Sequence, residues 1–330
     1  MEEPHAQWVG RAGGTRGRHN YWGTLETDSA PACCLLVKAE VIERVGLWDG
    51  RYFVYEDDVD WCLRARRAGF RVVSCLDAVV AHVPWHEKLT FQRLSFWLYQ
   101  SFRNRLWTIE KMSSSVGRVR VLREWRVRLL WHAVVAGVTH RKTHAEAIFS
   151  AIDDSLNNKG GKYAGSLPPS RPLVELLDDC GAFDGARTLA MVCDRAEFLQ
   201  AARDFRQRVR TAAAQRGGGV GFVEFVRNDL DTAGRRSGPD ETDVTRVVYS
   251  PRMRSKVWRQ RALVGRRVAA VVVFDAAGDL PLMAAAVTIH IDRSRPDVGV
   301  IERSGLWERA GFVWRWAQAR WRVGFSRATR

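Results

Sequence analysis

Apolar positions between residues 32 and 81 fall into short runs separated by polar breaks. Residues 32–37 are continuously apolar, and a run of this length predicts a strand buried on both faces. Glycines follow two stretches of helical spacing, where they provide natural helix ends. We therefore predict helices at 39–45 and 59–68 and further strands at 70–75 and 78–81. Such alternation with short connections is typical of an α/β fold.

The pattern becomes mainly helical after residue 88. Helices are predicted at 89–112, 119–138, 173–177 and 196–215, with a Gly- and Pro-containing loop at 157–171. A run of three glycines at 217–219 marks a boundary. Beyond it lie strand-like runs at 221–226, 266–274 and 284–291 and an Arg- and Trp-rich amphipathic stretch at 306–325. Three domains are predicted: residues 1–88, a helical extension at 89–215, and a small, basic α+β region at 216–330.

The net positive charge of the chain indicates which classes of binding partner are plausible. Lys plus Arg number 52 against 37 acidic residues, a net charge of +15, while the 46% hydrophobic content is that of a globular protein. An excess of this kind suits nucleic acid, an anionic membrane or phosphorylated substrates, or it reflects a genome composition that favours Arg. No zinc-finger, helix-turn-helix or RNA-recognition signature is present, so we expect no nucleic-acid partner.

The cysteines and the longest apolar stretches indicate where in the cell the protein is located. Six cysteines occur without a Cys-x-x-Cys pair, and adjacent Cys33 and Cys34 in an apolar run predict free, buried thiols in a reducing cytoplasm. The first ten residues are polar, and no apolar stretch reaches the ~20 residues of a spanning helix. We expect a cytoplasmic protein. The Arg/Trp-rich stretches at 119–138 and 306–325 could lie peripherally on the inner membrane face, or their Trp residues could pack in a core.

Four carboxylates stand within five positions, at Glu56, Asp57, Asp58 and Asp60. Like charges this close repel, so a fold that retains them normally needs a cation, a basic partner or a group that accepts a proton. A structural explanation is also open. Carboxylates gain from the positive end of a helix dipole, with Asp58 as N-cap and its neighbours in the first turn.

The order of motifs around these carboxylates resembles the second half of the family 2 glycosyltransferase domain, of GT-A type. The resemblance runs from Pro31 to His86: Ala-Cys-Cys-Leu-Leu-Val, Val-Gly-Leu-Trp-Asp, Tyr-Phe-Val-Tyr-Glu-Asp-Asp-Val-Asp, Arg-Ala-Gly-Phe, and Ala-Val-Val-Ala-His. It implies a partial GT-A (nucleotide-diphospho-sugar transferase) fold within an α/β chain. It also implies an inverting enzyme that transfers a sugar from a UDP- or dTDP-linked donor to a cell-wall or polyprenyl-linked glycan acceptor.

The resemblance implies a role for each matched residue. Asp58 would be the general base and Asp57 would orient the acceptor hydroxyls, while Asp60 would cap the helix or pair with Arg64. His82 would lie beside a divalent metal, Mn²⁺ or Mg²⁺, unless it is a core histidine. Trp85 would stack on the acceptor sugar, unless it packs internally.

Two departures from the family pattern leave alternatives open. Trp85 and the Ser-Phe-Arg-Asn-Arg-Leu string at 101–106 resemble galactofuranosyltransferases, whereas Ala32-Cys33 resembles rhamnosyltransferases. The family's donor-binding half, which ends in an Asp-x-Asp motif, has no counterpart before Asp57, and Asp229-Leu230-Asp231 predicts a turn instead. We therefore expect a truncated enzyme. The alternative is an inactive fragment or a basic glycan- or membrane-binding module that lacks the donor half.

Overall fold

The computed structural model describes most of the chain: residues 23–76, 78, 80–81, 90–112, 115–139, 141–193, 195–230, 243–250, 259–274, 286–292 and 295–325. The chain divides into two compact units. The first comprises Met1–Lys88, Trp97–Leu129 and Ser150–Ala164, and the second Leu89–Phe96, Leu130–Phe149 and Gly165–Arg330. Three helices contribute residues to both: α3 (Phe91–Met112), α4 (Ser115–Val138) and α5 (Lys142–Leu156).

The first unit begins with short elements around a small apolar core. In order they are β1 (Thr24–Glu26), the 3₁₀ turn η1 (Ala32–Cys34), α1 (Ala39–Val45), α2 (Asp57–Arg67) and β2 (Val73–Cys75), with β1 and β2 antiparallel. The core is centred on Trp61 and Cys62 of α2 and Val41 of α1. Trp61 stacks on Trp48 with ring centroids 4.6 Å apart.

The predicted strand at 32–37 is wrong. Ala32–Cys34 forms a 3₁₀ turn, and in the part of the chain that the structure describes this segment belongs to no sheet. Leu36 is fully exposed. Cys33 and Cys34 are also exposed, so the prediction of buried thiols at these two positions is wrong. A continuous apolar run specifies hydrophobicity, but it becomes a buried strand only when neighbouring strands cover it.

The predicted helices agree well with the structure. Helix α1 ends at Val45, where Gly46 takes φ +79° and its N–H bonds Ile42 O at 2.8 Å. Helix α2 has three acidic residues in its first turn and three Arg in its last, the arrangement that the helix dipole favours. The strand at 70–75 shortens to β2, and part of the strand predicted at 78–81 lies outside the described residues.

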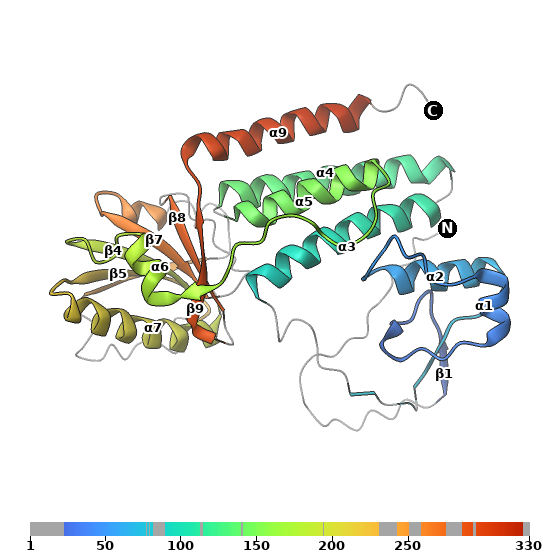
Figure 1. Cartoon of the computed structure of the whole chain (residues 1–330), viewed down its shortest axis with the longest axis horizontal. Helices are drawn as coiled ribbons and strands as arrows, with labels where there is room; N and C mark the ends of the chain where they lie inside the picture. The colour runs from blue at the N-terminus through green and yellow to red at the C-terminus, as the bar shows by residue number, and fades with distance from the viewer. Residues whose placement is uncertain are drawn as a thin grey trace. The chain divides into compact units, whose positions relative to one another are not determined.

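A mainly parallel sheet forms the centre of the second unit (Figure 1). Among the described residues it has the strand order β3-β9-β8-β7-β4-β5-β6, with β9 antiparallel to β8 and β3. The elements are β3 (Arg171–Pro172), α6 (Leu173–Asp179), β4 (Arg187–Cys193), α7 (Ala196–Gln215), β5 (Val220–Arg227), β6 (Val244–Tyr249), η4 (Gln260–Leu263), β7 (Val268–Val273), β8 (Val287–Asp292), β9 (Arg295–Arg303) and α9 (Leu306–Phe325).

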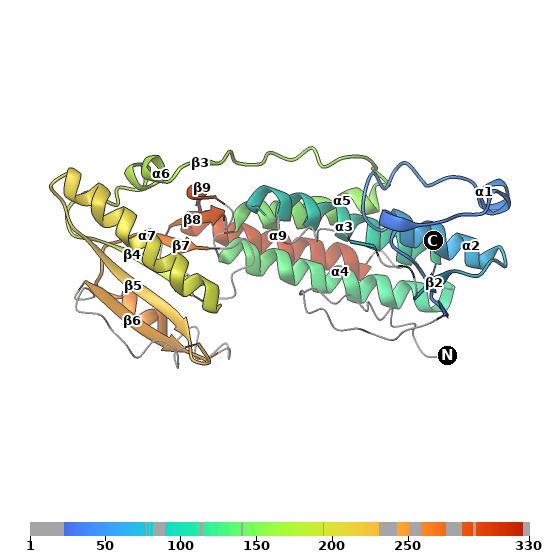
Figure 2. The same cartoon turned by 90° about the horizontal axis from the view of Figure 1, so that it is seen from below.

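Both faces of this sheet are buried, which is why its central strands are mainly apolar. One face packs on α6 and α7 through residues such as Leu176, Phe198 and Phe205. The other carries Val192, Phe225 and further strand residues in a separate cluster. Figure 2 shows α7 lying along the part of the sheet formed by β4 and β5. Strands buried on both faces are a general property of parallel sheets.

The predicted α/β class is confirmed by the mainly parallel sheet and the helices packed against it. The domain boundaries at 88/89 and 215/216 stay predictions. None of the described helices has the length and apolar character needed to cross a bilayer.

Candidate active site

The acidic cluster begins in an unusual loop just before α2. Phe53, Tyr55 and Glu56 have φ values of +66°, +65° and +63°, in the left-handed region that side chains with a β-carbon seldom occupy. Each such residue costs about 1–3 kcal/mol and persists only when surrounding contacts hold it. The loop therefore needs external support to present the carboxylates that follow.

Helix α3 supplies that support through Arg103 and Asn104. The Asn104 amide lies 2.8–2.9 Å from the carbonyl oxygens of Tyr52, Val54 and Tyr55. Arg103, fully buried, donates to the Tyr52 carbonyl at 3.1 Å and to the Gly161 carbonyl at 2.7 Å. These two side chains satisfy the carbonyl groups that the left-handed backbone turns inward. We call Arg103 and Asn104 the loop clamp.

Asp57 and Asp58 occupy the first two positions of α2 and are half-buried. One Asp58 oxygen accepts the N–H of Ala32 at 3.1 Å, and the other accepts that of Val59 at 2.9 Å. The segment that begins at Ala32 therefore lies beside the predicted base. Burial raises the pKa of Asp57, and the neighbouring charge of Asp58 adds to the shift.

Glu56 is held by a basic residue of α3. Its carboxylate lies 2.6 Å from Arg105, yet burial outweighs this ion pair and raises the pKa of Glu56. The charges of Asp58 and Asp57 act in the same direction. At Glu56 and Asp57, burial and the neighbouring negative charges therefore both favour the protonated carboxyl group.

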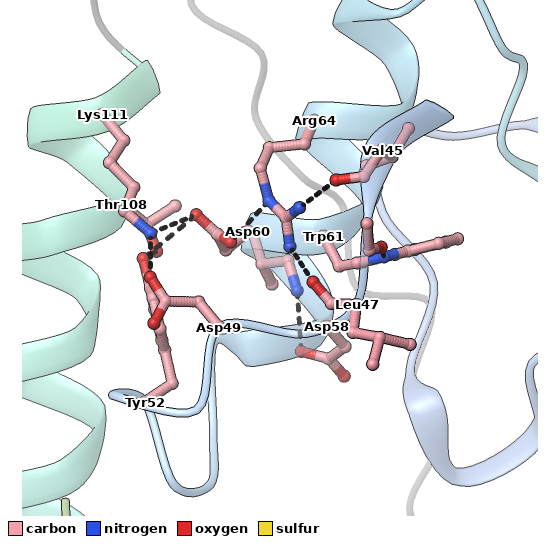
Figure 3. A network of polar contacts seen from close by, with 12 residues as sticks. Val45, Leu47, Asp49, Tyr52, Asp58, Asp60, Trp61, Arg64, Thr108 and Lys111 are labelled. Carbon is pink, nitrogen blue, oxygen red and sulfur yellow. Dashed lines mark hydrogen bonds and ion pairs between the residues drawn. The ribbon is translucent and has the colours of Figure 1, made fainter. Parts of the chain in front are cut away.

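Asp60 belongs to a separate, structural network (Figure 3). It is fully buried between Arg64, at 2.9 Å, and Lys111 of α3, at 3.0 Å, and it accepts the Tyr52 hydroxyl at 3.2 Å. Lys111 also pairs with Asp49 at 2.8 Å. The predicted pairing of Asp60 with Arg64 is confirmed, and this carboxylate serves to join α2 to α3.

The structure brings together only part of the predicted site. Asp57 and Asp58 are adjacent at the start of α2, but His82 and Trp85 lie outside the described residues. Within the described ranges, no group of three or more His, Cys, Asp or Glu side chains is arranged to hold a metal ion. Asp229 lies in a turn and bonds Arg227, whereas Asp231 is outside the described residues.

The sequence pattern predicts neither the loop clamp nor the role of Lys111. The string at 101–106 belongs to the family resemblance, but the resemblance implies no role for Arg103 or Asn104. A signal was present: Arg and Asn, adjacent on an otherwise aromatic helix, are polar residues that need partners when they are buried. Which backbone they serve could not be deduced, because Tyr52 and Asn104 are 52 positions apart.

Comparisons with known proteins locate the region to which this site belongs. Residues 24–106 match the family model described as glycosyltransferase like family 2. A low-salt glycan biosynthesis hexosyltransferase of Haloferax volcanii, Agl10, is 26% identical over 143 residues, which cover 41% of this chain and 44% of the relative. The chain thus matches less than half of that relative's length. No solved structure matches the chain. Residues 24–106, which carry the acidic cluster and the loop clamp, therefore form a glycosyltransferase family 2-like region.

Proposed function

We propose that this chain takes part in glycosyl transfer as an inverting glycosyltransferase, with Asp58 as the general base. The observation that carries the proposal is the clamped left-handed loop, which presents Asp57 and Asp58 side by side at the start of α2. Strained backbone held in place by a dedicated pair of side chains is characteristic of functional sites. The family match over residues 24–106 supports the same interpretation.

In the proposed reaction, the Asp58 carboxylate takes the proton of an acceptor hydroxyl. The acceptor oxygen attacks the anomeric carbon of the donor sugar as the bond from that carbon to the diphosphate oxygen breaks. The nucleoside diphosphate leaves with the bonding electron pair, and a single displacement inverts the anomeric configuration. Asp57 would orient a further acceptor hydroxyl, since it directly precedes the base in the first turn of α2. Base catalysis of this kind contributes roughly 10²–10⁴-fold to the rate.

The donor in this proposal is a UDP- or dTDP-linked hexose. A divalent metal, Mn²⁺ or Mg²⁺, would be held beside His82 and would neutralise charge on the departing diphosphate. An imidazole beside carboxylates is a donor set that Mn²⁺ accepts. We derive the proton transfer from Asp58 alone, and it requires no geometry at His82.

The acceptor in this proposal is a cell-wall or polyprenyl-linked glycan. The backbone at Ala32 bonds Asp58, so residues 32–33 are suitably placed to contact the acceptor. Ala32 and Cys33 resemble the rhamnosyltransferase type at these positions. Trp85 resembles the galactofuranosyltransferase type and would add a stacking surface.

The test compares Asp58→Asn with wild type for release of nucleoside diphosphate from a panel of UDP- and dTDP-hexoses and a polyprenyl-linked acceptor. We expect turnover to fall about 10²–10⁴-fold, because the amide cannot accept the proton, while the dissociation constant of the donor stays unchanged. Glu43→Gln, at an exposed carboxylate of α1, is the matched control and should retain full turnover. Wild-type turnover in Asp58→Asn would refute the base assignment. Glycan binding without any turnover in wild type would favour the basic binding module instead.

A further inference from the structure

Helix α9 has an inner face that is fixed by specific contacts within the second unit. Phe312 is buried and stacks on Phe149 of α5 with ring centroids 6.3 Å apart. A β-carbon at Gly137 of α4 would overlap the Phe312 ring, so the two helices meet closely there. Ion pairs of Arg315 with Glu146 and of Lys142 with Glu308 lie alongside. These contacts attach one side of α9 to α4 and α5.

The outer face of α9 is apolar, which is the reverse of the usual arrangement. Trp307, Trp314 and Trp321 recur every seven residues and are 87%, 66% and 67% exposed. The same face carries Leu306 (77% exposed), Val313 (46%) and the exposed alanines 310 and 317. A helix on the surface of a globular protein normally turns polar residues outward. A contiguous exposed apolar stripe of this kind marks an interaction surface.

A basic side chain borders this stripe. Arg320 is exposed and its guanidinium lies over the Trp316 ring, 5.3 Å from the centroid. The whole chain also carries a net charge of +15. Trp is the residue best suited to a boundary between apolar chains and polar headgroups, because its ring is apolar and its N–H is polar. Arg at the edge adds attraction to anionic headgroups.

We propose that the outer face of α9, formed by Leu306, Trp307, Ala310, Val313, Trp314, Ala317 and Trp321, binds the surface of an anionic phospholipid bilayer. The helix would lie in the plane of the interface with its three Trp rings among the headgroups. Figure 1 shows α9 as one long uninterrupted helix, as this mode requires. Positive charge at the border of the stripe favours a lipid surface over a second copy of the chain, since two such borders would repel each other.

The experiment measures binding of the full chain to vesicles by co-sedimentation, with phosphatidylglycerol vesicles compared with phosphatidylcholine vesicles. Wild-type protein should bind phosphatidylglycerol vesicles at least tenfold more strongly than phosphatidylcholine vesicles. The triple variant Trp307→Gln, Trp314→Gln, Trp321→Gln should lose binding at least tenfold, while Arg320→Gln should lose about fivefold at low salt. A matched triple, Leu47→Gln, Leu156→Gln and Val264→Gln, alters three exposed apolar residues elsewhere and should bind like wild type.

A second measurement keeps the proposal testable if a variant folds poorly. Brominated lipids quench Trp fluorescence at the headgroup boundary, so they should quench wild-type protein and, to the same extent, the matched triple. The proposal is overturned if wild type neither sediments with nor is quenched by phosphatidylglycerol vesicles. It is equally overturned if light scattering shows a dimer that the Trp triple dissociates, because the stripe would then bind a second copy.

Discussion

Arg103 shows how one side chain can determine the shape of a site that it does not enter. It is fully buried, and the oxygens that it bonds are neutral: carbonyls of Arg51, Tyr52 and Gly161 and the side chains of Tyr99, Gln100 and Asn104. Its guanidinium also lies over the rings of Tyr99 and Trp107. A planar group with several fixed donors can satisfy such a set, whereas an ammonium group cannot.

We therefore expect Arg103→Lys to behave as a severe substitution. Lys would leave several buried carbonyls without donors, at about 1–3 kcal/mol for each unsatisfied group. Unfolding in urea should show a loss of several kcal/mol, and glycosyl transfer should fall because the Asp58 loop loses its support. Arg128→Lys on α4, where Arg128 is exposed, is the control and should change stability by less than about 0.5 kcal/mol. Equal stability of the two variants would contradict the role of Arg103 as a clamp.

At the scale of elements, the attachment of α2 to α3 depends on a small number of buried ionic contacts. Lys111 joins Asp60 of α2 and Asp49 of the preceding turn, and hydrogen bonds to Arg51 and Lys111 lower the pKa of Asp49. Burial raises the pKa of the adjacent Tyr52. Because Asp60 is fully buried, removing one of its partners leaves an incompletely compensated charge.

Lys111→Met tests this attachment. We expect a loss of about 3 kcal/mol in the free energy of unfolding, since breaking a buried ion pair costs about 3–5 kcal/mol and Arg64 still compensates Asp60 in part. The matched control is Arg120→Met, which removes an exposed ion pair with Glu124 on α4 and should cost below about 1 kcal/mol. Urea denaturation, monitored by Trp fluorescence, measures the loss of unfolding free energy in each of the two variants. A loss for Lys111→Met no larger than that of the control would show that the Lys111 ion pairs do not hold α2 to α3.

The sequence predicts the helices of this chain better than its strands. Helical spacing and terminal glycines located α1, α2, α3, α7 and α9 closely, because these signals are local. The run at 32–37 failed as a strand because burial depends on neighbours that the run itself does not specify. Helix α5 and strand β4 were not predicted. The carboxylates of the site were found from their spacing, whereas the loop clamp depends on a contact between segments about fifty positions apart.

For the molecule as a whole, the loss of stability between pH 6.5 and 5 should originate in the second unit. His144 is buried against Phe91, near Glu302, His290 and Arg141, and burial lowers its pKa to about 3. Burial disfavours the Glu302 carboxylate, but its interactions with His290, His144 and Thr143 outweigh that effect and lower the pKa of Glu302. Both groups therefore take up protons more readily in the unfolded chain than in the folded one.

The sign of the pH dependence follows directly. Below pH ~6.5 the unfolded chain protonates His144 while the folded chain does not, so stability falls as the pH decreases from ~6.5 towards 3. One proton corresponds to a slope of up to about 1.4 kcal/mol per pH unit. His144→Gln should flatten this slope between pH 6.5 and 5 in urea denaturation, while His132→Gln, at an exposed position, should not. An unchanged slope in His144→Gln would assign the acid sensitivity to other groups.

The left-handed loop also has a consequence during synthesis of the protein. A nascent chain that has reached Asp60 contains every carboxylate of the cluster, but Arg103 and Asn104 have not yet been made. Phe53, Tyr55 and Glu56 have left-handed backbone angles that are unfavourable for these residue types. Without the clamp they cannot keep these angles. The ribosome must therefore add some forty more residues before the loop can settle. This part of the protein should therefore reach its native conformation only after α3 has formed.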